Sequence, residues 1–397
     1  MSRTAEARRI YLDGTAGLPM DPRVLEAMKP FFSEKFGNPS SIHFFGREGR
    51  SALEAGRKSV ADLVHAKDAK EMIFTSCATE SINLAIKGLA QRNKTEGNHI
   101  VISQMEHMSV INTCKFLQKN GYEVTQVPPD KEGIVQIADL EKAIRKETLL
   151  VSVMWANNEI GTLQPMEEIG KLCAEKDVYF HSDAVAAAGR VPIDVQKAKV
   201  DLLSLSSNDI YGPKGVGALY VKEGTKLESI LQGGGQERNL RSGSENIPGV
   251  VGFGAAADIM RAEMGPETAR LRILRDKLVK GVTSTIKETY VNGSPTLRIP
   301  TNASIRFLYI EGESLILNLE MQGIAVSSGS ACASKTLEPS HVLRCIGLPH
   351  EEAHGTLQFS LNRWTHEQDI DHVIAVLPEI VKRLRDMSPL TPDSLKD

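Results

Sequence analysis

The segment 76–81, Ser-Cys-Ala-Thr-Glu-Ser, has the residue types of a phosphate-binding helix start. It follows an apolar run at 72–75 that predicts a strand, and a helical pattern comes after it. The first amides of a helix have no backbone partner and attract anions, and Ser and Thr hydroxyls add further donors. An ordinary N-cap uses the same residue types, so this segment alone leaves both interpretations open.

A second candidate is Cys332, which lies in the segment 327–334, Ser-Ser-Gly-Ser-Ala-Cys-Ala-Ser. Small residues around a thiol are typical of an exposed loop and not of a core, so Cys332 is a candidate reactive thiol. The wide spacings of all five cysteines and the lack of a CxxC pair indicate neither a closed zinc site nor a disulfide framework. We expect Cys114, Cys173 and Cys345 to be buried thiols.

The third candidate is the stretch 204–217, where apolar runs at 200–205 and 216–221 flank a turn of small residues. Such residues let the backbone come close to a ligand. A tight hairpin loop of an α/β protein has the same composition, and for a lone turn this simpler interpretation is favoured.

The elements that position these segments alternate between strand and helix. We predict strands at 9–12, 72–75, 100–103, 123–127, 149–154, 178–182 and 201–205, with helices such as 81–89, 109–118 and 167–174 between them. This alternation predicts a mainly parallel sheet with helices on both faces. From about residue 266 the pattern changes to a long charged helix, 267–287, and strands near Tyr290 and at 303–308, 325–327 and 357–361. A smaller α+β domain is therefore expected.

The composition is that of an ordinary globular protein, with 397 residues, 41% hydrophobic and 24% charged. The net charge of −3 gives no indication of a nucleic-acid or anionic-membrane surface. No apolar run approaches membrane-spanning length, and the first residues lack an apolar signal core. We expect a cytoplasmic protein with no nucleic-acid or membrane partner.

The stretch 204–217 strongly resembles the cofactor loop of cysteine desulfurases of the NifS/IscS type, which are fold-type-I pyridoxal-phosphate (PLP) enzymes. Their pattern is S-G-H-K-I-Y-G-P-K-G-x-G-A-L-Y, and its lysine forms the Schiff base with PLP. The flanking segment 210–215 is intact here, but Asn208 and Asp209 stand in place of the His-Lys pair. The resemblance covers nearly the whole chain, from residue 11 to about Leu384.

Further motifs carry the resemblance to other cofactor contacts. Segment 76–81 matches S-G-A-T-E-S with Cys77 for the glycine, 157–161 matches V-N-N-E-x-G and 181–186 matches H-x-D-A-x-Q. The resemblance implies that His107 stacks on the pyridine ring, Asn158 meets the 3′-oxygen, and Asp183 keeps the ring nitrogen protonated so that PLP is an electron sink. The implied cofactor-binding residues are Ala78, Thr79, His107, Asn158, Asp183, Ser206, Asn208, Asp209 and Ser244.

The remaining matches concern catalysis, substrate and assembly. Cys332 corresponds to the cysteine that attacks the substrate sulfur, becomes a persulfide and passes sulfur to an acceptor. Arg363 corresponds to the arginine that binds the substrate carboxylate, for which a bidentate fork is suited, although a surface ion pair is its ordinary role. Ser244 keeps a hydroxyl that reaches the phosphate of the neighbouring subunit in the family, which implies a homodimer. The implied architecture is a large α/β domain, 19–264, and a small domain from 1–18 and 265–397.

The departures from the family pattern gather at the cofactor. Desulfuration needs the lysine amine, and Asp209 cannot form an imine. The histidine is also replaced, by Asn208, and a glutamine by Ala186. Three changed contacts together favour natural divergence over a single laboratory substitution.

Our leading hypothesis is a desulfurase homologue in iron–sulfur cluster assembly with PLP-dependent desulfuration lost. It would dock on an IscU-type scaffold protein and offer Cys332 as sulfur carrier or as an iron ligand of a shared iron–sulfur cluster. The alternative is a working desulfurase that holds PLP non-covalently. Another fold-type-I enzyme, such as an aminotransferase, fits less well because it also needs the lysine and does not need the Cys332 loop.

Overall fold

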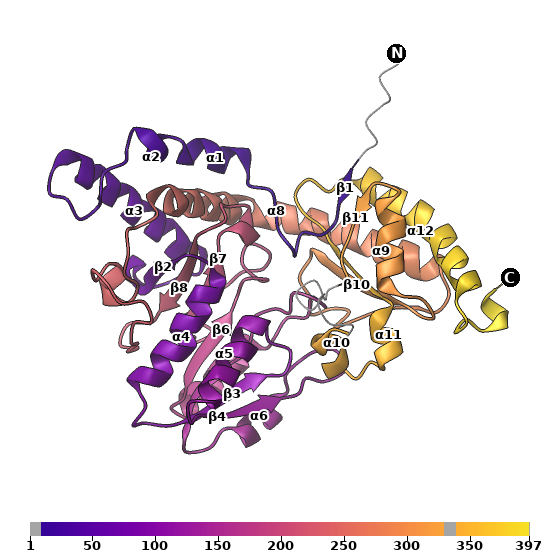
Figure 1. Cartoon of the computed structure of the whole chain (residues 1–397), viewed down its shortest axis with the longest axis horizontal. Coiled ribbons are helices and arrows are strands. Elements are labelled where there is room, and N and C mark those ends of the chain that lie inside the picture. The colour runs from indigo at the N-terminus through magenta and orange to yellow at the C-terminus, as the bar shows by residue number, and fades with distance from the viewer. Residues whose placement is uncertain (1–8, 329–338, 397) are drawn as a thin grey trace, which may run out of the picture.

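The computed structural model describes residues 9–328 and 339–396, and a seven-stranded sheet lies at the centre of its larger part (Figure 1). The strand order is β2-β8-β7-β6-β5-β3-β4. Their bounds are β2 (Met72–Thr75), β3 (His99–Ser103), β4 (Glu123–Val127), β5 (Thr148–Ser152), β6 (Tyr179–Asp183), β7 (Leu202–Ser206) and β8 (Gly217–Val221). The strands from β4 to β7 are parallel, and β8 is antiparallel to both of its neighbours. The prediction of an α/β fold with a mainly parallel sheet is confirmed.

Helices cover both faces of this sheet. They are α3 (Phe44–Leu63), α4 (Ala78–Arg92), α5 (Met108–Gln118), α6 (Ile137–Ala143), α7 (Met166–Glu175) and the first half of α8 (Ile247–Thr285). Two shorter helices, α1 (Pro22–Met28) and α2 (Pro30–Ser33), pack on α8. In β3, Val101 packs into one apolar core, while Ile100 and Ile102 pack into the core under α4 and α5. A strand buried on both faces needs apolar side chains at successive positions, which explains the continuous apolar run in its sequence.

The longest helix, α8 (Ile247–Thr285), begins 20 residues before the helix predicted at 267–287. Its start is capped by Asn246, whose side chain accepts a hydrogen bond from the amide of Gly249. The helix continues through Pro266, which lacks the N–H that would continue the helical ladder. Its first half packs on α3 at Gly56 and Gly254, where an added Cβ would lie 2.8 Å or less from the other helix. Tertiary packing therefore sustains a segment of low intrinsic helix propensity.

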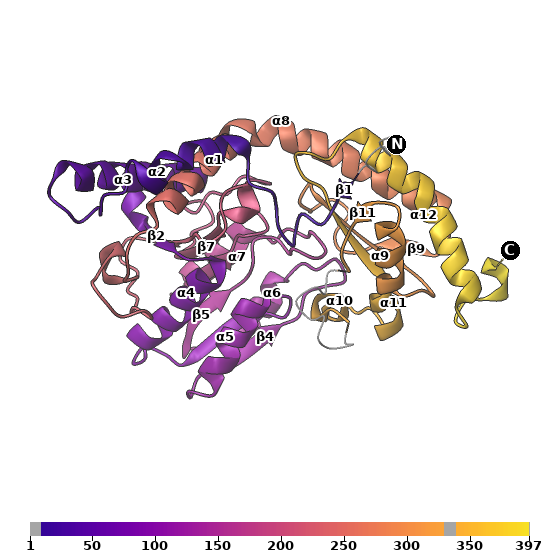
Figure 2. The same cartoon turned by 45° about the horizontal axis from the view of Figure 1, so that its top comes forward.

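The smaller part has a three-stranded antiparallel sheet of order β12-β10-β9 (Figure 2). Its strands are β9 (Thr289–Val291), β10 (Asn302–Phe307) and β12 (Thr356–Ser360), and a parallel pair is formed by β1 (Ile10–Tyr11) and β11 (Ile324–Ala325). Its helices are α9 (Gly312–Glu320), α10 (His341–Cys345), α11 (His350–His354) and α12 (Glu367–Met387). The second half of α8 joins this part and runs along α12 (Figures 1 and 2).

The apolar core of this smaller part contains Leu12, Leu278, Phe307, Phe359 and Leu377. Because α8 runs unbroken past residue 264, the domain boundary there stays a prediction. No helix in the described part of the chain has the length and apolar character needed to cross a membrane.

Candidate functional site

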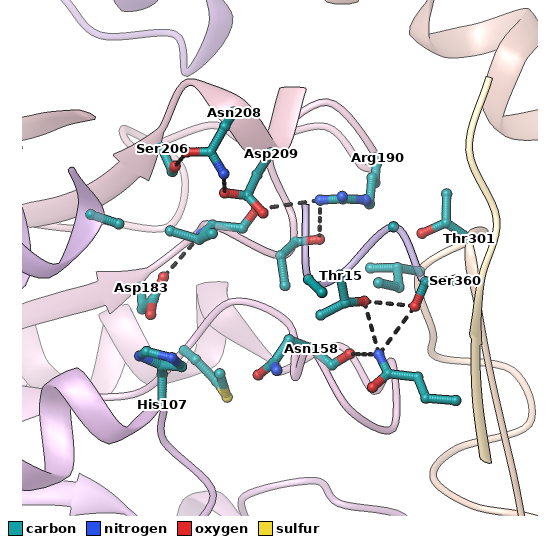
Figure 3. A pocket seen from close by; sticks show the side chains of 18 of the residues that line it. Thr15, His107, Asn158, Asp183, Arg190, Ser206, Asn208, Asp209, Thr301 and Ser360 are labelled. Carbon is teal, nitrogen blue, oxygen red and sulfur yellow. Dashed lines mark hydrogen bonds between the residues drawn. The ribbon is translucent and has the colours of Figure 1, made fainter. Parts of the chain in front are cut away.

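A cavity of about 290 Å³ opens between the two parts of the molecule, next to the carboxyl ends of the parallel strands (Figure 3). Asp183 ends β6, Ser206 ends β7, and His107 follows β3 after a short turn. Ligands in open parallel sheets bind at this edge, because the loops that leave the strands meet there. The sequence-predicted residues Ala78, Thr79, His107, Asn158, Asp183, Ser206, Asn208 and Asp209 all line this cavity.

Asp183 and His107 lie on the same side of the cavity (Figure 3). Asp183 is only 5% exposed, and its Oδ1 accepts a hydrogen bond from the amide of Val185 at 3.0 Å. Burial raises the pKa of Asp183 above its usual range, while the nearby His107 lowers it. His107 is positioned by Ser109, whose hydroxyl lies 2.7 Å from its Nδ1. The carboxylate of Asp183 and the ring of His107 can therefore both face a flat, protonated heterocycle in the cavity.

The start of α4 forms another wall. Cys77 is its N-cap residue but makes no side-chain capping bond, so the cap leaves the first amides of the helix available to a ligand. Gly217, at the start of β8, lies so close to the start of α4 that an added Cβ would be 2.6 Å from the carbonyl carbon of Cys77. This close backbone approach and the exposed Thr79 make the α4 start suitable for a phosphate group.

Asp209 and its neighbours form the wall where the family has its lysine. Asn208 donates from Nδ2 to Oδ2 of Asp209 at 3.0 Å, and its Oδ1 accepts from Ser206 at 2.9 Å (Figure 3). Burial raises the pKa of Asp209, the charge of Arg190 lowers it and the charge of Asp183 raises it. The Nη1 of Arg190 donates to the carbonyl oxygens of Val185 and Ala186 at 3.4 and 3.2 Å. Two carboxylates and one guanidinium therefore share the cavity wall.

The opposite wall comes from the smaller part of the molecule. Gln358 donates from Nε2 to Oγ1 of Thr15 at 2.8 Å and to the backbone oxygen of Asn158 at 2.5 Å. Thr15 and Ser360 are joined by a hydroxyl contact of 2.6 Å (Figure 3). We did not predict Thr15, Gln358, Ser360 or Arg190 from the sequence. Arg190 could have been suspected from its position seven residues after the predicted Asp183. The local sequence around Thr15, Gln358 and Ser360 gives no indication of a cavity.

Two predicted site residues lie away from the cavity. The guanidinium of Arg363 pairs with the carboxylate of Asp21, lies 3.5 Å from Glu263, and stacks 4.3 Å from the ring centre of Tyr211. It lines a separate hollow beside these acidic residues, so its role toward a substrate carboxylate stays a prediction. Ser244 is exposed, after the short helix η3 (Glu237–Asn239), and its role across a dimer interface also stays a prediction. Cys332 lies outside the described residues.

The described cysteines differ in their surroundings. Cys114 and Cys173 are 1% exposed, as predicted, and burial raises the pKa of each thiol to about 12. Cys345 is only half-buried, with its Sγ 3.6 Å from the carbonyl oxygen of Gln104, and burial raises its pKa to about 11. Cys77 is exposed and lines the cavity. Among the described residues no group of three or more His, Cys, Asp or Glu side chains is arranged to hold a metal ion.

The side chain of Glu106, directly before His107, is buried, and its burial should have a measurable effect on the stability of the protein. It accepts hydrogen bonds at Oε1 from Ser103 and from the amide of Met154, but its buried Oε2 has no partner. Burial raises its pKa from 4.5 to about 8. The folded protein therefore keeps a proton that the unfolded chain releases, and stability should fall as the pH rises from about 4.5 through about 8.

We expect Glu106→Gln to flatten this pH dependence, because glutamine is neutral throughout the range. Wild-type protein should lose on the order of 2–4 kcal/mol of unfolding free energy between pH 5 and pH 8, and the variant should lose clearly less. Urea unfolding at both pH values measures the difference. The control Glu34→Gln changes an exposed residue and should keep the wild-type pH dependence of the unfolding free energy. If Glu106→Gln lost as much unfolding free energy between the two pH values as the wild type, the raised pKa would not belong to Glu106.

Comparison with known proteins agrees with the geometry. The model of the class-V aminotransferases, "Aminotransferase class-V", matches residues 10–373. The chain belongs to this family. It is 52% identical over 380 residues to "Cysteine desulfurase IscS 1" of Archaeoglobus fulgidus, covering 96% of this chain and 99% of that protein. It is 49% identical to "Cysteine desulfurase IscS" of Methanosarcina thermophila, covering 98% and 96%. A solved structure, "NIFS-LIKE PROTEIN", matches with a TM-score of 0.89 at 36% identity and covers 95% of this chain and all of that one.

These matches confirm the resemblance to cysteine desulfurases and the fold type, for which PLP is the expected cofactor. The cavity residues fit the ring and phosphate of PLP: Asp183 could hold the ring nitrogen, His107 the ring face, and the α4 start the phosphate. They do not fit its covalent attachment, because the described residues that line the cavity include no lysine and Asp209 occupies the position. No catalytic step through PLP is therefore assigned to this chain.

Proposed function

We propose that this class-V aminotransferase homologue acts in iron–sulfur cluster assembly without desulfurating cysteine itself. The observation that carries the proposal is the carboxylate of Asp209 in the cavity at the place of the family's lysine. Desulfuration needs an amine there that binds the cofactor and moves protons on the substrate. A half-buried carboxylate hydrogen-bonded to Asn208 supplies no such amine.

The remaining part of the hypothesis concerns Cys332 and the partner. The relatives named IscS support a role in cluster assembly, and we propose that this chain forms a homodimer and docks an IscU-type scaffold protein. Cys332 would then provide a thiolate to iron in a nascent cluster. We favour the ligand over the sulfur carrier, because a persulfide made from free sulfide needs an oxidant and a thiolate ligand does not.

A decisive experiment separates sulfide production from cluster retention. Purified protein with added PLP and L-cysteine is expected to release no sulfide above a no-protein control. With an IscU-type scaffold, ferric iron, dithiothreitol as reductant and sodium sulfide, wild-type protein is expected to co-purify with a coloured cluster. The Cys332→Ser variant should keep the complex but retain at least tenfold less cluster, measured by visible absorbance and by iron content.

Cys77→Ser is the matched control, because Cys77 is the exposed thiol among the described cysteines. It should retain the wild-type amount of cluster. Equal retention in the Cys332→Ser complex would overturn the ligand role. Sulfide release by the wild type at a catalytic rate would instead support the second candidate, an active desulfurase that holds PLP without a covalent bond.

That second candidate has its own supporting observation. Asp183, His107 and the uncapped start of α4 are all in place around the cavity. They are the contacts on which a non-covalent PLP site would depend. The sulfide measurement above decides between the two functions.

A further inference from the structure

The position of Asp209 suits a ligand that carries its own amine. A lysine at this position reaches the 4′-carbon of the cofactor through four methylene groups and its nitrogen. An aspartate side chain is shorter by two atoms, and a charge-assisted N–H···O contact of about 2.8 Å spans roughly the missing length. The carboxylate of Asp209 followed by a ligand ammonium thus replaces the lysine without a change in the place of the ring.

The charges around the cavity favour the same ligand. Arg190 is the charged group that offsets Asp209, but its Nη1 is already bonded to the carbonyl oxygens of Val185 and Ala186. Asp209 accepts a hydrogen bond from the amide of Asn208, and a hydrogen bond from Ser206 also lowers its pKa, but both donors are neutral. Asp183 and Asp13 place two further carboxylates on the same cavity. A half-buried carboxylate in this setting is stabilised by a cationic partner, and an ammonium supplies both the charge and the donors.

An aldehyde has the opposite properties at this position. Its oxygen is an acceptor and cannot donate to Asp209, so its lone pairs would face those of the carboxylate. The amine of pyridoxamine 5′-phosphate is a donor and is charged. The rest of that molecule presents the same ring and phosphate to Asp183, His107 and the start of α4.

We propose that the cavity binds the amine form of the cofactor, pyridoxamine 5′-phosphate, in preference to forms that lack the amine, and that Asp209 is the residue that determines this specificity. The inference builds on the family's expected cofactor but not on the function proposed above. It concerns what the cavity holds, and it stands whether or not Cys332 binds iron.

Equilibrium binding to the full-length protein tests it with two probes that differ in one group. Pyridoxamine 5′-phosphate carries an ammonium on the 4′-carbon, and pyridoxine 5′-phosphate carries a hydroxyl there. Titration calorimetry on protein freed of small molecules should give wild-type affinity at least tenfold higher for the amine. Asp209→Asn has the same shape without the charge, and it should reduce the preference to less than threefold while leaving the affinity for the hydroxyl probe within threefold.

Asp386→Asn, an exposed aspartate on α12, is the control and should keep the wild-type preference. Equal affinity of wild-type protein for the two probes would overturn the proposal, as would binding of neither probe. A preference that survives in Asp209→Asn would also overturn it, because the specificity would then come from another group. The readout is affinity alone, so a failure here is distinguishable from sulfide release or loss of cluster, which test the function.

Discussion

The Asp209→Lys variant is expected to turn yellow with PLP and to stay yellow after dialysis, whereas the wild type loses the colour. The ring and phosphate contacts are already present at Asp183, His107 and the start of α4. A lysine amine at residue 209 would then bond covalently to the aldehyde, and covalent attachment resists dialysis. We expect at least tenfold more retained PLP absorbance per protein than in the wild type.

The matched control is Asp209→Met, which removes the carboxylate and has a long side chain without an amine. It should not retain the colour. A variant that also carries Asn208→His and Ala186→Gln restores the three altered contacts and should release more sulfide from L-cysteine than Asp209→Lys alone. If Asp209→Lys binds no more PLP than Asp209→Met does, the cavity has changed beyond this one residue, and the fit of the ring and phosphate contacts is wrong.

Glu237→Gln is expected to destabilise the protein by about 3–5 kcal/mol, because it removes the buried charged partner of the Arg57 guanidinium. The charged partner that Arg57 keeps is the exposed Glu54, 3.3 Å from its Nε. The side chain of Arg57 is 8% exposed and that of Glu237 is 3% exposed, and they form two hydrogen bonds of 2.7 and 2.8 Å. Glu237 also accepts from the amide of Phe74 at 2.8 Å, and Arg57 donates to the carbonyl oxygen of Met72 at 2.8 Å. The pair therefore ties α3 to β2 and to the loop that leads to Ser244.

Urea unfolding of the variant and the wild type measures this loss. Asp139→Asn is the control, because its ion pair with Lys142 lies on the surface, with side chains 47% and 77% exposed. Exposed pairs contribute little, so that variant should differ from the wild type by less than about 1 kcal/mol. A similarly small change in Glu237→Gln would show that Arg57 finds another partner or water when the carboxylate is neutralised.

Local sequence patterns predicted the sheet better than they predicted the helices. The strands predicted at 72–75 and 123–127 have the observed bounds, and eight further predicted strands differ by one or two residues at their ends. Continuous apolar runs of this length occur where both faces of a strand are covered. The first half of α8 was missed because Gly249, Gly252 and Gly254 lower its helix propensity. Only the tertiary packing explains two of these glycines, because Gly252 lies against Met28 and Pro213, and Gly254 lies against Gly56 of α3.

The order and spacing of the motifs determined the family, the cofactor region and the replacement of the lysine by Asp209. Each motif is a local pattern in the sequence, and the replacement of the lysine is a change at one position of such a pattern. Both can therefore be recognised without coordinates. Of the predicted cofactor-binding residues, all except Ser244 line the cavity, because loops at the carboxyl ends of parallel strands must meet at one edge.

Only the tertiary structure decided which side chains are partners. It places Arg190 near Asp209, Gln358 and Thr15 opposite them, and Arg363 on Asp21 and not at the cavity. Asp21 and Arg363 are separated by 342 residues, and nothing in either local sequence indicates that they meet. The charge that a buried carboxylate or guanidinium faces depends on distances between segments, and these distances are set by packing of the whole fold.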